Sequence, residues 1–162
     1  PGDTVSITEV QDAIDNAAPS SDILTSRLMP GPTGESNRFM EYGRGIVLCL
    51  GPGKQAALDQ ASIARANGCG AVAVAPGLSE NERINGILPA EFLKEFNGLA
   101  AVAYDGDEAS LRAMRIALAQ RDGPLIALCA EDDLATRCRL ERHICIDTTA
   151  AGGNATLLAE AS

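Results

Sequence analysis

The chain has 162 residues, of which 46% are hydrophobic, and its formal net charge is −9 at pH 7. This length and hydrophobic content are sufficient for one domain with a core of two or three layers. An acidic surface repels phosphate and no cluster of Lys or Arg offsets it, so nucleic acid is excluded as a predicted partner. The apolar runs are far shorter than the roughly 20 residues that span a bilayer, and no signal-peptide pattern precedes them, so the sequence predicts a cytoplasmic protein without a transmembrane segment.

The cysteines are predicted to be reduced core residues and not metal ligands or disulfide partners. There are five of them, an odd number, and none stands in a C-x-x-C spacing. A zinc site would need better spacing than one distant histidine supplies, whereas a free cysteine packs as a small hydrophobic residue. The residues concerned are Cys49, Cys69, Cys129, Cys138 and Cys145.

Residues 1–43 are predicted to form an N-terminal helix and a linker. Ser6 to Glu9 has the form of a capping box, and it precedes apolar residues at helical spacing, namely Val10, Ala13, Ile14 and Ala17. Pro19 would end this helix. Residues 19–37 are rich in Pro, Ser, Gly and Asp and are predicted to be a linker. Residues 38–42 are predicted to form a short edge strand.

Residues 44–143 are predicted to form a Rossmann-like α/β domain. Continuous apolar runs, expected to be strands, alternate with amphipathic segments, expected to be helices, which is typical of a parallel sheet covered on both faces. The expected strands are residues 46–50, 71–75, 99–104 and 125–129. The expected helices are residues 54–67, 89–96, a helix capped by Asp107 with Leu111, Met114 and Leu118 inside, and residues 135–142.

Residues 144–162 are predicted to form a flap strand and a C-terminal segment outside this domain. Residues 38–42 and 144–147 are expected to be strands of a small flap separate from the main sheet. Their apolar residues need a partner surface, because a two-stranded ribbon alone is only marginally stable in water.

The turn at residues 51–56 follows the pattern G-x-G-x-x-A between an expected strand and an expected helix, which is typical of a dinucleotide-binding turn. The candidate cofactor-binding residues are Gly51, Gly53 and Lys54. However, no acidic residue follows the next strand to bind a ribose. The carboxylates of Asp105, Asp107 and Glu108 would repel pyrophosphate at the next helix N-terminus. A non-functional nucleotide site is therefore predicted, and a free-standing nucleotide-binding domain is the alternative.

No catalytic residue is predicted in this chain. Cys129 and Glu131 lie close together in sequence, but no segment with the character of a catalytic nucleophile is present. His143 is the only histidine and is better explained as a residue on the outside of the last strand.

Two segments resemble long proline utilization A (PutA) proteins. Residues 30–37, with the sequence Pro-Gly-Pro-Thr-Gly-Glu-Ser-Asn, resemble the segment that follows the aldehyde dehydrogenase module of that family. The second segment resembles the motif that closes those polypeptides, and it consists of Thr148, Thr149, Ala150, Ala151, Gly152, Gly153, Asn154, Ala155, Thr156, Leu157 and Leu158. Its glycines, alanines and leucines also suit a segment that docks on another surface.

The resemblance implies a degenerate domain of the aldehyde dehydrogenase superfamily. It implies a bifunctional parent with an FAD-dependent proline dehydrogenase module and an NAD-dependent L-glutamate γ-semialdehyde dehydrogenase module. These modules channel the intermediate and would be the partners of this domain, and a homo-oligomer stays open. The domain itself would hold no cofactor; it would cover the channel, and its final motif would support the dehydrogenase active site.

Overall fold

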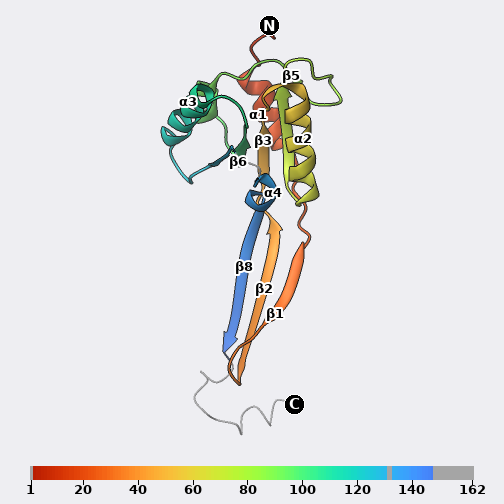
Figure 1. The fold of residues 1–162 in the computed structure, drawn as a ribbon, viewed down its shortest axis with the longest axis vertical. Coiled ribbons are helices and arrows are strands. Elements are labelled where there is room, and N and C mark those ends of the chain that lie inside the picture. Colours follow the sequence, from red (N-terminus) through yellow and green to blue (C-terminus); the bar gives the residue numbers. More distant parts are fainter. Residues whose placement is uncertain (1, 131–132, 148–162) are drawn as a thin grey trace.

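The computed structural model describes residues 2–130 and 133–147. Its elements form an α/β domain and a three-stranded sheet that extends from the domain as a long arm (Figure 1). No helix within the described ranges is both long and apolar enough to cross a membrane.

A five-stranded parallel sheet forms the centre of the α/β domain. Its strand order is β5-β4-β3-β6-β7. The strands are β3 (Ile46–Cys49), β4 (Gly70–Ala75), β5 (Ile84–Asn85), β6 (Leu99–Ala103) and β7 (Ala127–Cys129). The chain starts in the middle of this sheet, adds β4 and β5 on one side and then crosses to the other side for β6 and β7. The predicted Rossmann-like α/β fold is therefore confirmed.

Helices cover both faces of the sheet. On one face α2 (Gly53–Ala66) buries a stripe of alanines, Ala57, Ala61 and Ala64, against β3, β4 and β6. On the other face lie α1 (Ile7–Asp15), α3 (Glu108–Ala119) and the 3₁₀ helix η1 (Ala90–Lys94), which bury Val10, Met114 and Leu93. Small side chains let α2 lie close to the sheet, whereas larger side chains fill the opposite layer.

Several helix boundaries differ from the prediction. The Ser6 side chain makes no capping hydrogen bond, and α1 ends at Asp15, before Pro19 is reached. Asp107 does cap α3, since its side chain accepts a hydrogen bond from the Ser110 amide. The helix expected at residues 135–142 is wrong for most of its length, because α4 covers only Leu134–Arg137 and a strand follows.

The arm is an antiparallel sheet with the order β1-β2-β8. It consists of β1 (Thr25–Met29), β2 (Glu35–Gly43) and β8 (Arg139–Asp147), and it is called the flap below. The prediction that residues 38–42 and 144–147 pair outside the main sheet is confirmed. Two other predictions are wrong: residues 25–29 are a strand of the flap and not part of a linker, and residues 38–42 lie in its central strand, not at an edge.

Four of the five cysteines are buried in the core, as expected. They all belong to the layer between α2 and the sheet. Cys145 is the exception, because it lies exposed on the flap, and its predicted core position is wrong.

Candidate functional site

The glycine turn between β3 and α2 is closed by a side chain of the same chain. Gly51 and Gly53 have φ angles of +95° and +77°, which only glycine adopts readily. The buried Gln60 donates from Nε2 to the Gly51 carbonyl at 2.7 Å and accepts from the Gly51 amide at 3.0 Å. The Gly51 carbonyl also accepts from the Asp105 amide at 2.8 Å. The Gly51 amide, one of the donors that a phosphate at this turn could use, therefore has an internal partner.

Lys54, the third candidate residue of this turn, is paired with a carboxylate. Its Nζ lies 2.7 Å from Oε2 of Glu82, in the loop before β5. Glu82 also accepts from the amide and the hydroxyl of Ser79, at 2.8 and 2.9 Å. The hydrogen bond from Lys54 and the two from Ser79 lower the pKa of Glu82 to about 2, so the carboxylate stays charged. The Lys54 ammonium thus has a carboxylate partner within the chain.

The N-terminus of α3 is likewise occupied by a carboxylate. Asp107 accepts from the Ser110 hydroxyl at 2.7 Å, from the Ser110 amide at 2.9 Å and from the Tyr104 hydroxyl at 3.1 Å. The Ser110 hydroxyl, followed by the Ser110 amide, lowers the pKa of Asp107. A negative charge already complements the helix dipole at the point where a bound phosphate would lie.

A hollow of about 260 Å³ lies at the carboxyl ends of β6 and β7, where open α/β sheets bind ligands. Its lining includes Asp59 and Gln60 from α2, Asp105 after β6, and Cys129 at the end of β7. Among the described residues that line it there is no Lys or Arg. The hollow therefore offers a pyrophosphate two carboxylates and no cation.

The flap, in contrast, presents an exposed apolar surface. In antiparallel register Leu28, Arg38 and Ile144 stand in one row, so they share a face of the sheet. Leu28 is 71% exposed and Ile144 46% exposed, and Ile146 on the same face is 55% exposed. Every residue of β8 is exposed, and β8 is an edge strand with nine residues. A long exposed edge beside apolar side chains marks a surface suited to contact another protein surface.

Known proteins supply the context for this arrangement. No model of a known protein family matches the chain. The chain is 34% identical to the bifunctional protein PutA of Escherichia coli (strain K12) over 149 residues, which cover 83% of the chain and 11% of that protein. It is 33% identical over 147 residues to the bifunctional protein PutA of Salmonella typhimurium, again covering 83% and 11%. The chain is homologous to a segment of bifunctional PutA proteins.

Solved PutA structures share the fold of this segment. A mutant of Bradyrhizobium japonicum proline utilization A matches with a TM-score of 0.52, and a crystal structure of a bifunctional proline utilization A protein matches with 0.50. Both are 25% identical, and each match covers 66% of this chain and 13% of the solved chain. The segment spans about a tenth of the length of the PutA proteins it matches, so the activity of a whole PutA protein is considered below as a proposal.

The root of the flap in this PutA segment is held by one arginine. The Arg44 amide donates to the Cys138 carbonyl at 2.8 Å, its Nε to the Arg137 carbonyl at 2.6 Å and its Nη2 to the Arg139 carbonyl at 3.2 Å. Arg139 in turn donates to Asn67 Oδ1 at 2.9 Å. These bonds connect the end of β2 and the start of β8 with the end of α2, so the flap leaves the domain in a defined direction.

The sequence-predicted site residues are only partly brought together. Gly51 and Gly53 share one turn with Lys54, but the docking motif of residues 148–158 and Glu131 lie outside the described residues. His143 is exposed on the flap, whereas Cys129 ends a strand of the main sheet.

The sequence analysis missed the residues that close the candidate nucleotide site and hold the flap. Gln60 carried a weak signal, because it is a polar residue next to the alanine stripe of α2. Glu82 and Arg44 carried none, because their partners are distant in sequence: Lys54 is 28 residues from Glu82, and Arg137 is 93 residues from Arg44.

Proposed function

We propose that this chain is the non-catalytic C-terminal domain of a long bifunctional PutA protein that oxidises proline to glutamate. In this proposal the same polypeptide carries an FAD-dependent proline dehydrogenase module and an NAD-dependent L-glutamate γ-semialdehyde dehydrogenase module. The domain binds neither cofactor. It covers the channel between the modules, and residues 148–158 dock beside the dehydrogenase active site.

The observation that carries the proposal is the exposed flap on a segment homologous to PutA. A nine-residue edge strand with exposed apolar side chains on one face is unfavourable on an isolated surface, because it invites pairing with other chains. A second module of the same polypeptide is the partner most accessible to it, since a linked partner has a high effective concentration. The homology of the chain to a segment of bifunctional PutA proteins supports a partner of this kind.

The internal partners at the glycine turn support the non-catalytic part of the proposal. Gln60 occupies the Gly51 amide, Glu82 pairs with Lys54, and Asp107 caps α3. A free-standing nucleotide-binding domain, the alternative from the sequence, would need these groups for its ligand. Titration with NAD in a thermal-shift assay separates the two, because a ligand at a hundred times its dissociation constant stabilises by about 2.7 kcal/mol. No shift is expected.

The decisive experiment removes residues 148–162 from the full-length protein. Oxidation of added semialdehyde should fall by on the order of a hundredfold, because an active-site loop displaced by about 1 Å loses that much rate. Proline dehydrogenation should stay nearly unchanged, and it serves as the internal control for folding. An unchanged rate and affinity for semialdehyde would show that the motif is merely a tail and would overturn its assigned role.

A further inference from the structure

Two cysteines meet at the point where the flap leaves the α/β domain. Cys69 lies in the turn between α2 and β4, and Cys138 connects α4 with β8. The Cys69 thiol donates to the Cys138 carbonyl oxygen with Sγ and O 3.1 Å apart. Although 69 residues separate them in sequence, both are buried in the layer between α2 and the sheet.

The surroundings of this pair shift the pKa values of the two thiols in opposite directions. The hydrogen bond from Cys138, together with the backbone amides of Gly45 and Arg44 and the charge of Arg44, lowers the pKa of Cys69 to about 6 although burial opposes this. The pKa of Cys138 is raised, because its thiol hydrogen is held by Cys69 and because it is buried. One sulfur thus readily becomes a thiolate, the form that reacts with oxidants, and its neighbour keeps its proton.

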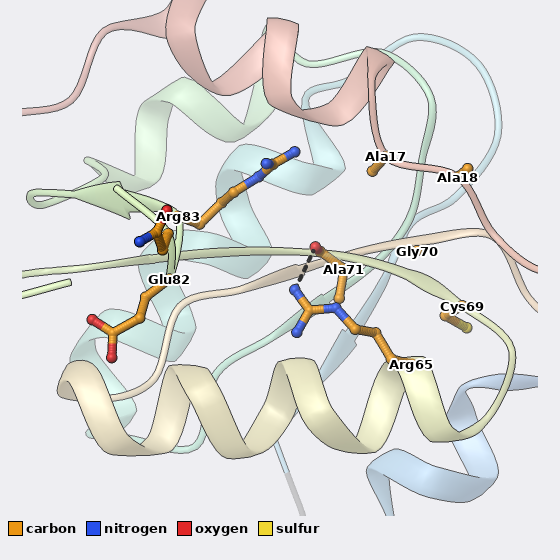
Figure 2. Close-up of a pocket in the computed structure, with 9 residues that line it drawn as sticks. Ala17, Ala18, Arg65, Cys69, Gly70, Ala71, Glu82 and Arg83 are labelled. Carbon is orange, nitrogen blue, oxygen red and sulfur yellow. Dashed lines mark hydrogen bonds between the residues drawn. The ribbon is translucent and has the colours of Figure 1, made fainter. Parts of the chain in front are cut away.

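Cys69 also borders a cavity of about 250 Å³ that opens to the surface. Figure 2 shows Cys69 at one end of this cavity, beside Gly70, with the side chains of Arg65 and Arg83 further along its walls. A small neutral oxidant can therefore approach Cys69 through the cavity. Cys49 does not line it, and burial raises the pKa of Cys49 to about 12, so this neighbouring thiol stays unreactive.

We propose that Cys69 and Cys138 are a redox-active dithiol that hydrogen peroxide converts to a disulfide at the root of the flap. The Cys69 thiolate attacks one peroxide oxygen, the O–O bond breaks, and Cys69 sulfenic acid and hydroxide form. The hydroxide takes the Cys138 proton, giving water, and the Cys138 sulfur attacks the Cys69 sulfur. A second hydroxide leaves the Cys69 sulfur as the S–S bond forms, and it combines with the proton that the Cys69 thiol released to solvent when it ionised. Two thiols and one peroxide thus become one disulfide and two waters.

The bridge would join the domain to the flap covalently. Arg44 already binds the carbonyls on both sides of Cys138 and that of Cys138 itself, which fixes the start of β8. A bond from Cys138 to Cys69 adds a second connection at the same point, directly to the beginning of β4. Peroxide would therefore lock the direction in which the flap leaves the domain. The inference rests on these contacts and not on the proposed function.

The test is a disulfide map of the full-length protein after treatment with hydrogen peroxide, alkylation and digestion with trypsin. Each of the five cysteines of this chain falls in a separate tryptic peptide, and the two of interest are residues 66–83 and 138–139. These two peptides are expected to be linked, and dithiothreitol should separate them. Cys69→Ser and Cys138→Ser should each abolish the link, whereas the matched control Cys145→Ser, at the exposed flap cysteine, should retain it.

Three outcomes would overturn the proposal: a link between other cysteines of the chain, irreversible oxidation of Cys69 without a bridge, or unmodified peptides 66–83 and 138–139 after exposure to peroxide. The map of the wild-type protein needs no substitution. It therefore decides the question even when a serine variant does not fold.

Discussion

Replacing Gln60 by Met should destabilise the protein by about 1.5–4.5 kcal/mol. The Gln60 amide holds the Gly51 amide and carbonyl at the same time, in a buried position. Methionine keeps the side-chain length and the helix propensity but makes neither bond. The buried Gly51 amide then lacks a partner, which costs about 1–3 kcal/mol, and the lost bond to the carbonyl costs about 0.5–1.5 kcal/mol. The carbonyl retains its bond from Asp105.

Urea unfolding of the 162-residue chain measures this loss as a lower midpoint. The matched control is Gln55→Met on the same helix, because Gln55 is exposed and only bonds Asp59 four residues away at 2.8 Å. A surface pair of this kind contributes about 0.2–0.5 kcal/mol. Equal midpoints for the two variants would refute the view that Gln60 holds the glycine turn.

Two further changes test other parts of the structure. Gly43→Ala should destabilise by about 1–3 kcal/mol in the same assay, because the added methyl group would meet the backbone of Gly68, and an unchanged midpoint would contradict this close approach. Glu82→Gln should remove a stabilisation that depends on pH. The folded pKa of Glu82 is about 2 and its ordinary value is 4.5, so the contribution is full above pH 4.5 and is lost as the pH falls towards 2. The stabilities of wild type and variant should therefore converge in acid, and a difference that is independent of pH would contradict the ion pair.

The parts of the fold that were predictable from sequence are those set by local pattern. A continuous apolar run such as residues 71–75 predicts a fully buried strand, and all side chains of this strand are buried. The alanine stripe of α2 likewise predicts which face of that helix is buried. β1 was missed because Thr25–Met29 lies in a stretch rich in Pro, Ser and Gly, and its register with β2 comes only from pairing across the flap. The start of β8 was missed because Arg139–Asp147 has charged residues among apolar ones and is exposed on both faces.

The motif of the candidate site was predictable from the sequence, but the internal partners of its residues were not. The glycine pattern correctly places a tight turn before α2, because Gly51 and Gly53 both adopt positive φ. The motif does not contain the residues that pair with the turn. Gln60 accepts from the Gly51 amide and Glu82 pairs with Lys54, and only the folded chain brings these two residues to the turn.

The free-energy cost of opening the turn explains why a recognisable nucleotide motif need not bind a nucleotide. A pyrophosphate that bound the Gly51 amide would displace Gln60, and the buried polar groups of Gln60 would then lack partners at a cost of about 1–3 kcal/mol. Displacing Asp107 from the N-terminus of α3 would remove a cap that contributes about 0.5–2 kcal/mol. Together these costs are about 1.5–5 kcal/mol, and since each 1.4 kcal/mol is tenfold in affinity, binding would weaken by roughly ten- to several-thousand-fold. A micromolar site would become a site of about ten micromolar to a few millimolar. The bonds of Gly51 with Gln60 and Asp105 meanwhile link the ends of β3 and β6.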